Sequence, residues 1–130
     1  MIKIFINPMA KPRMTQRDKW LSPPRKVISR YNAYKDGVRL LARCQMLGEE
    51  NLSPALRLDF HIECPESWSK SKIFEYSGTP HQQKPDIDNL IKAILDIFFE
   101  DDSVVYMVNA AKFWTKPGDG CILISEEKTS

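Results

Sequence analysis

Hydrophobic and polar residues alternate most clearly over residues 56–64. The apolar members of this alternation are Leu56, Leu58, Phe60, Ile62 and Cys64. Because successive side chains of a strand point to opposite faces, the pattern predicts a strand with one buried face and one polar face. Shorter apolar runs predict strands over residues 1–6, 104–113 and 121–125. A Pro-Gly-Asp-Gly turn between the last two favours an antiparallel hairpin.

Two segments show helical spacing instead. Over residues 32–48 the apolar positions are Tyr34, Val38, Leu41 and Met46, and over residues 88–99 they are Leu90, Ile91, Ile94, Leu95 and Phe98. Recurrence at three and four residues predicts an amphipathic helix in each segment. In the first helix, Lys35, Arg39 and Arg43 share the face opposite the apolar one.

The element order β-α-β-α-β-β predicts an α+β fold, in which a small mixed sheet packs against two helices. A chain of 130 residues fits a single domain, residues 1–130. Residues 8–30 are basic and rich in proline and predict a loop. Residues 65–83 predict a second long loop, with room for one helical turn near residues 73–76, and its length makes it a candidate binding loop.

The sequence also excludes some classes of protein. No apolar run approaches the ~20 residues that span a bilayer, and the first residues lack the pattern of a signal peptide, so we expect a cytoplasmic protein without membrane contact. Cys44, Cys64 and Cys121 are odd in number and widely spaced. We therefore expect reduced, partly buried thiols rather than a disulfide framework or a cysteine-rich metal site.

Charge is segregated along the chain. Residues 1–43 contain 11 Lys and Arg against 2 Asp and Glu, a balance of +9. Residues 44–130 contain 8 against 15, a balance of −7, and six of these acids lie between Lys84 and Asp102. The first part suits a polyanion and the second suits a cation, as expected of a protein that grips phosphates and hydrolyses its substrate with a metal ion.

Asp86 and Asp88 are the strongest candidates for chemistry. They are separated by one residue in the extended chain that precedes a helix, so both carboxylates point the same way. Two like charges on one face repel each other, and a divalent cation such as Mg²⁺ relieves that repulsion. The alternative is helix capping, which explains one of the two carboxylates.

Further charged residues follow along the predicted helix. Lys92 lies four residues after Asp88, where it either neutralises a substrate or forms a surface ion pair. Asp96 lies a turn later, and we expect it to be solvated. Glu100, Asp101 and Asp102 follow the helix C-terminus, which is the unfavourable end of the helix dipole for acids. A returning strand could bring Asp101 or Asp102 back towards the first acidic pair; the alternative is an ordinary acidic turn.

Two other kinds of site are disfavoured. A calcium loop starting at Asp86 would need glycine at its sixth position and glutamate at its twelfth, but Ile91 and Ile97 stand there. His61 and His81, the only histidines, lie near no recognisable serine or cysteine nucleophile motif.

The segment KPDIDNLIKAILD at residues 84–96, followed by EDDSVV at residues 100–105, resembles the RusA family of Holliday junction resolvases, which phages and prophages often encode. The Asp-x-Asp-Asn-Leu-x-Lys core, the apolar helix and the Asp-Asp-x-x-Val segment occur in the family's order and spacing. Chain length, the Lys11-Pro-Arg13 motif, the two helices and the terminal hairpin also agree. Residues 65–83 depart from the family, since this loop is longer than in compact members.

The resemblance implies a homodimeric, Mg²⁺-dependent endonuclease that cuts four-way DNA junctions by paired nicks in recombination and repair. It implies that Asp86, Asp88 and Asp102 are essential metal-binding carboxylates, that Asp101 is an accessory ligand, and that Lys92 is the catalytic lysine. The basic first third would supply phosphate contacts that are indifferent to sequence. The candidate DNA-binding residues there are Lys11, Arg13, Arg17, Arg39 and Arg43.

Two alternatives stay open. One is a non-catalytic DNA-binding phage protein that retains the fold, although the intact set of acids and lysine argues against it. The other is a nuclease that acts mainly on forks or flaps, which the sequence does not distinguish from a junction resolvase.

Overall fold

A computed structural model describes residues 1–46 and 52–127. Its helices are α1 (Lys26–Met46), α2 (Lys70–Tyr76) and α3 (Ile87–Phe98), and its short 3-10 turns are η1 (Gln16–Lys19) and η2 (Asp102–Val104). Its strands are β1 (Ile2–Ile4), β2 (Ala55–Glu63), β3 (Met107–Thr115) and β4 (Cys121–Glu126). The predicted α+β class with a small mixed sheet is confirmed.

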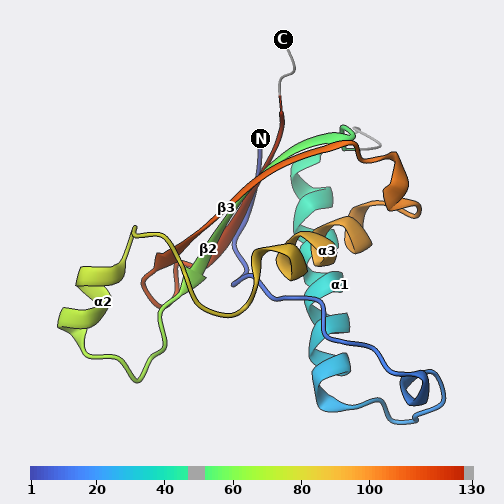
Figure 1. The fold of residues 1–130 in the computed structure, drawn as a ribbon, viewed down its shortest axis with the longest axis horizontal. Coiled ribbons are helices and arrows are strands. Elements are labelled where there is room, and N and C mark those ends of the chain that lie inside the picture. The colour runs from blue at the N-terminus through green and yellow to red at the C-terminus, as the bar shows by residue number, and fades with distance from the viewer. Residues whose placement is uncertain (47–51, 128–130) are drawn as a thin grey trace.

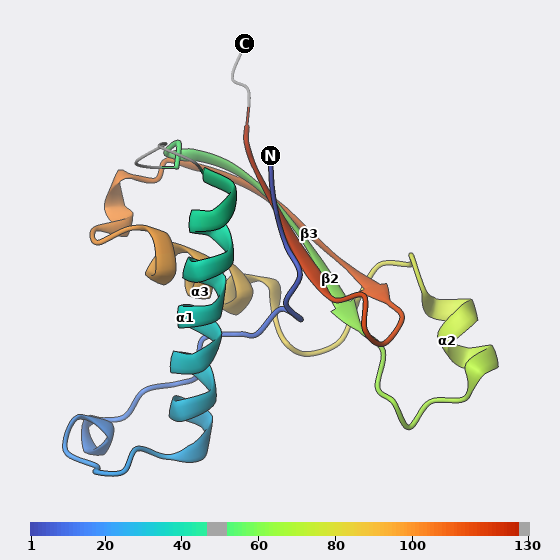
Figure 2. The same ribbon diagram turned by 180° about the vertical axis from the view of Figure 1, so that it is seen from behind.

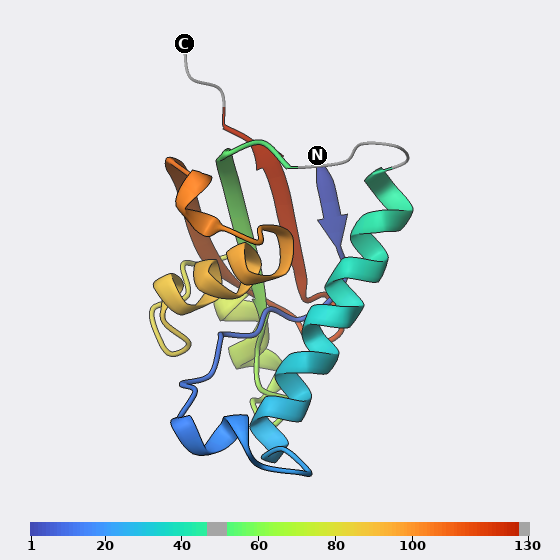
Figure 3. The same ribbon diagram turned by 90° about the vertical axis from the view of Figure 1, so that its right-hand side faces the viewer.

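The strands form one sheet in the order β1-β4-β2-β3, with β2 between the last two strands of the chain (Figure 3). The predicted hairpin between residues 104–113 and 121–125 is therefore wrong. The turn at residues 116–120 does reverse the chain, but it connects β3 to β4 across the end of β2, which lies between them. Glu63 ends β2, and its Oε1 accepts a 2.8 Å hydrogen bond from the Gly118 N–H. Crossing one intervening strand requires only about 10 Å.

β2 and β3 pair in parallel, from Ala55 opposite Met107 to Glu63 opposite Thr115. Parallel neighbours need a long crossover connection, commonly a helix, because the chain must return to the end at which it started. α3 lies in that connection. The pairing of β2 with β4 and that of β4 with β1 are antiparallel, which makes the sheet mixed.

α1 and α3 cover the same face of the sheet (Figure 3). The alternating residues of β2 bury their apolar side chains beneath these helices, as the sequence predicts. The core also takes Tyr31, Tyr34 and Val38 from α1 and Leu90, Ala93 and Ile94 from α3. Burial of these side chains fixes α3, and with it the acids at its two ends, relative to the sheet.

The helix boundaries differ from the predictions most at α1, which begins at Lys26 rather than residue 32. Ile28 and Tyr31 extend its buried stripe toward the N-terminus, so part of the predicted basic loop is helical. The predicted end of this helix at residues 47–48 lies outside the described residues. α2 is a helix of seven residues rather than a single turn. It stands at one end of the sheet, away from α1 and α3 (Figure 2).

The cysteines are free, as predicted: Cys64 and Cys121 are buried and Cys44 is exposed. Across residues 1–46 and 52–127, no helix combines the length and apolar composition that crossing a bilayer requires.

Candidate active site

Asp86 and Asp88 lie at the N-terminus of α3, where both line one open hollow of about 690 Å³. Asp86 occupies the N-cap position, yet its side chain makes no capping hydrogen bond. Both residues are exposed. The capping alternative therefore does not account for the Asp86 carboxylate. The expectation that the two carboxylates share one face agrees with this geometry.

Lys112 of β3 ties the chain before α3 to the sheet. Its Nζ donates hydrogen bonds to the carbonyl oxygens of Gln83 at 2.6 Å and Pro85 at 2.7 Å, and its side chain lines the hollow. These two bonds hold the loop that leads into α3 against β3. Sequence reasoning missed Lys112. The signal for it was one lysine inside an otherwise apolar strand segment.

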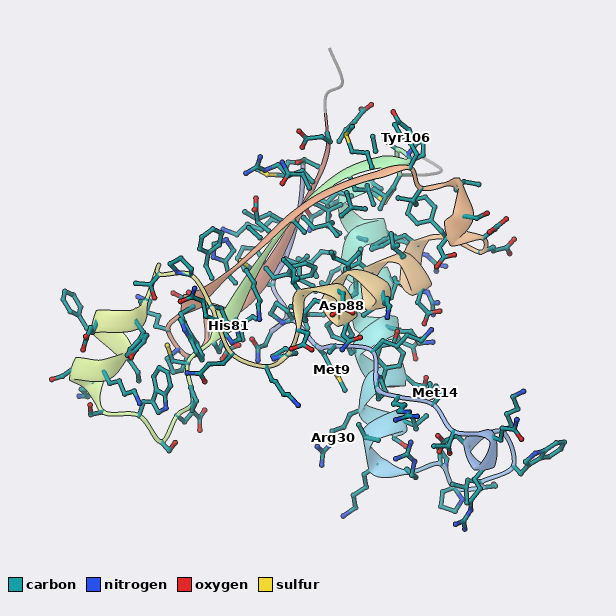
Figure 4. The ribbon with its side chains drawn as sticks, in the orientation of Figure 1. Met9, Met14, Arg30, His81, Asp88 and Tyr106 are labelled. Carbon is teal, nitrogen blue, oxygen red and sulfur yellow. The ribbon has the colours of Figure 1, made fainter. Side chains whose placement is uncertain are left out.

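His81 is the second residue of the hollow that sequence reasoning missed. It is buried, and its ring centroid lies 4.1 Å from that of Trp114. Its Nδ1 has no hydrogen-bond partner among the described residues. Burial and the nearby Lys112 ammonium lower the pKa of His81, so the ring is neutral near pH 7. His81 lies beside the sheet and Asp88 at the start of α3 (Figure 4).

Lys92 lies one helical turn beyond Asp88. Its Nζ is 3.7 Å from Asp88 Oδ2, and both side chains are about two-thirds exposed. An exposed ion pair at this spacing contributes only about 0.3–0.5 kcal/mol to stability. The Lys92 ammonium is therefore accessible beside the hollow, and it contributes little to the stability of the fold.

Asp101 and Asp102 lie at the opposite end of α3. This helix has 12 residues, which corresponds to a length of about 18 Å. Asp101 accepts hydrogen bonds from the Ser103 hydroxyl at 2.6 Å and the Ser103 N–H at 3.1 Å. These bonds lower the pKa of Asp101. Asp102 is exposed.

The strand that returns after Asp102 does not bring Asp101 or Asp102 into the hollow that Asp86 and Asp88 line. β3 does run back past α3 (Figure 1), but it brings Lys112 rather than Asp101 or Asp102 to the chain before Asp86. Within the described part of the chain, no three or more His, Cys, Asp or Glu side chains are grouped to hold a metal ion. A single chain thus offers the pair Asp86 and Asp88 at one end of α3 and a second acidic pair at the other.

Asp96 is less solvated than expected, because about two-thirds of its side chain is covered. Tyr31 donates a hydrogen bond to its carboxylate at 2.9 Å, and the Nζ atoms of Lys11 and Lys35 each lie 3.5 Å from it. Partial burial raises the pKa of Asp96, but the Tyr31 bond and the two ammonium groups outweigh burial and lower it. Asp96 thus joins α1, α3 and the segment before α1.

The candidate DNA-binding residues differ in the contacts that they make with other residues of the protein. Lys11 is paired with Asp96. Arg39 donates to the Ile97 carbonyl at 3.4 Å and lies 3.7 Å from Asp36. Arg13, Arg17 and Arg43 are exposed. The last three are therefore the most accessible to a phosphate backbone.

The comparisons with known proteins bear on this arrangement. A family model described as Endodeoxyribonuclease RusA matches residues 6–122. Comparison with curated proteins gave no match, and comparison with solved structures gave none. The matched span contains the hollow, both acidic pairs, Lys92 and all five candidate DNA-binding residues. Because the match covers most of the sequence, this chain belongs to the RusA endodeoxyribonuclease family.

Proposed function

We propose that this protein is a Mg²⁺-dependent endonuclease that resolves four-way DNA junctions by paired, symmetric nicks. Membership of the family implies an endodeoxyribonuclease that acts on Holliday junctions. The observation that carries the finer proposal is the pair Asp86 and Asp88, whose carboxylates line one hollow at the start of α3.

The donor set fits Mg²⁺. This ion binds proteins through one or two carboxylates and takes waters and substrate phosphate oxygens as its other ligands. Asp86 and Asp88 offer two exposed carboxylates, and the Asp86 side chain accepts no capping hydrogen bond from the helix. Asp86 and Asp88 would hold the ion, which would supply an activated water molecule and positive charge at the scissile phosphate.

Lys92 is suited to assist at the phosphate. Its ammonium lies beside Asp88, at the rim of the hollow, and no buried group holds it. We expect it to neutralise charge that develops on the phosphate oxygens as the P–O bond to the 3′-oxygen breaks. The exposed arginines at positions 13, 17 and 43 would hold the flanking DNA through its backbone.

A two-fold dimer is the arrangement that supplies two nicks from one hollow per chain. It also gives the second acidic pair a role. Val104, Tyr106 and Met107, which follow Asp102, are all exposed, and large exposed side chains in one segment suit a protein interface. Packing of this segment against a second copy would bring Asp101 and Asp102 of one chain toward Asp86 and Asp88 of the other.

The direct test is to incubate the purified protein with matched four-way junction, fork and duplex DNAs, with and without Mg²⁺, and to measure cleavage of each. We expect paired nicks in the junction, dependence on Mg²⁺ and little cleavage of duplex. Preference for the fork would identify forks or flaps as the substrate. Binding without cleavage of any of them would identify a non-catalytic DNA-binding protein.

Mixed dimers test the sharing of acids between copies. Asp88→Asn and Asp102→Asn chains are co-expressed with different tags, and the mixed dimer is purified through both. If the pairs meet between copies, both mutations affect one site, the second site is intact, and the dimer nicks the junction without resolving it. If each chain forms its own site, both sites are damaged and no nick appears.

A further inference from the structure

Residues 11–25 form an arm that projects from the body of the protein near the N-terminal end of α1 (Figures 1 and 3). Trp20 lies at the end of η1 within this arm and is 85% exposed. An indole ring presents a large flat apolar surface, which proteins usually bury or use for binding.

The arm is braced although it is exposed. The Asp18 carboxylate accepts hydrogen bonds from Arg25 Nε at 2.7 Å and from a second guanidinium nitrogen of Arg25 at 2.8 Å. It also accepts from the Thr15 N–H at 2.8 Å. Arg25 reaches the Arg13 carbonyl, and the Trp20 N–H donates to the Arg17 carbonyl. These contacts hold the backbone beneath Trp20, so less conformational freedom is lost when the ring binds a partner.

Positive charge surrounds the ring. Residues 11–30 contain seven Lys and Arg and a single acid, Asp18, which Arg25 neutralises. Arg17 and Lys19, on the same turn as Trp20, are exposed. Proteins that bind unpaired nucleic acid combine these two features: cations that follow the phosphates and an aromatic ring on which a base stacks.

Phe74 on α2 shows that exposure alone does not create this combination. It is 87% exposed, but its neighbourhood balances Lys70 and Lys72 against Glu66 and Glu75. A polyanion gains little there. Phe74 is therefore a matched control for an exposed aromatic side chain on a short helix.

The arm is also attached next to the candidate active site. The Lys11 N–H donates to the carbonyl of Asn89, the residue after Asp88, at 3.1 Å. Nine residue-to-residue steps separate Lys11 from Trp20, so the two lie at most about 30 Å apart. DNA held at the hollow would have to extend no further than this distance to meet the ring.

We propose that Trp20 stacks on an unpaired base at the branch point of the DNA while Arg17 and Lys19 contact the adjoining phosphates. The proposal rests on the proposed function only in taking branched DNA as the substrate. It adds a recognition element for unpaired bases to the sequence-independent grip on the backbone.

The test measures binding of the full chain in EDTA, so that its result does not depend on cleavage. The DNAs are a four-way junction, a single-stranded oligonucleotide and a duplex of equal length, with 2-aminopurine at the branch point of the junction. We expect Trp20→Ala to weaken binding to the junction and the single strand by about 10-fold while duplex binding stays within about two-fold. Trp20→Phe should retain most of the affinity and the quenching of 2-aminopurine, and Phe74→Ala should match the wild type.

The salt dependence separates the ring from the cations. Arg17→Ala with Lys19→Ala should weaken binding to all three DNAs and reduce the slope of log affinity against log salt by about 0.7–0.9 per lost contact. Trp20→Ala should leave the slope unchanged. Equal losses on duplex and single strand, or no loss on either, would overturn the stacking role.

Two further measurements exclude other partners for the ring. A change in the sedimentation coefficient of free Trp20→Ala would mean that Trp20 contacts a second copy. Loss of binding to anionic phospholipid vesicles, with DNA binding retained, would mean a lipid partner. Either result contradicts the proposal. If the wild type binds single strands through Trp20 but cuts no junction, the proposed function fails and the stacking role stands.

Discussion

The Tyr31 hydroxyl on α1 donates a 2.9 Å hydrogen bond to the Asp96 carboxylate on α3, joining residues 65 positions apart. Tyr31 is fully buried, and burial together with Asp96 raises the pKa of its hydroxyl. The phenol is therefore neutral near pH 7 and remains a hydrogen-bond donor. This bond links the two helices that cover the sheet.

We expect Tyr31→Phe to lower the free energy of unfolding by roughly 1 kcal/mol, because it removes one bond to a half-buried carboxylate and keeps the ring. Cleavage should be unchanged. Urea unfolding measures the stability. Tyr34→Phe is the matched control, since the buried Tyr34 hydroxyl has no hydrogen-bond partner in the described residues, and it should cost less. Equal losses of stability in the two variants would show that the hydrogen bond to Asp96 does not stabilise the fold.

We expect Asp88→Asn to abolish cleavage while junction binding survives or tightens, because a metal ligand and a negative charge near the phosphate are both lost. Asp86→Asn and Asp102→Asn should behave alike, Asp101→Asn should be milder, and Asp96→Asn should reduce stability more than activity. Gel-shift and cleavage assays on one junction rank the five variants. Full activity of Asp88→Asn in Mg²⁺ would exclude a metal-binding role for this carboxylate.

Lys92→Ala distinguishes an ion pair from a catalytic contact. Its exposed pair with Asp88 predicts a stability change well under 1 kcal/mol. A lost contact to the phosphate in the transition state predicts a rate lower by about 100-fold or more, with binding preserved. Single-turnover cleavage at saturating enzyme measures the rate, and Lys35→Ala tests an ammonium that serves Asp96 instead. If Lys92→Ala cleaves at a rate near the wild-type value, Lys92 has no catalytic role and forms only a surface ion pair.

His81 predicts how stability depends on pH. Burial and Lys112 lower its pKa in the folded state, so below the ordinary histidine pKa of about 6.5 the unfolded chain binds more protons than the folded chain. The free energy of unfolding should therefore fall as pH drops from 7.5 to 5. Urea unfolding of the wild type and His81→Gln at both values checks this. The wild type should lose more stability over that interval, and equal losses would contradict the prediction.

The sequence by itself determined the elements that depend on neighbours along the chain. Alternation over residues 56–64 identified β2, and helical spacing placed α3 within one residue of its observed start. Local spacing also placed Asp86 and Asp88 together, because two residues separated by one in an extended segment share a face. The motif around them identified the family, which the match over residues 6–122 confirms.

The tertiary structure decided which elements meet. The sequence pattern predicts strands at residues 104–113 and 121–125. A local pattern does not say that β2 lies between them, since strand pairing depends on packing over long separations. The length of α3 separates Asp102 from Asp88, and the partners of Asp96 come from distant segments. The burial of His81 against Trp114 arises in the same way. Contacts between residues far apart in sequence leave no periodic signal, so only the folded chain reveals them.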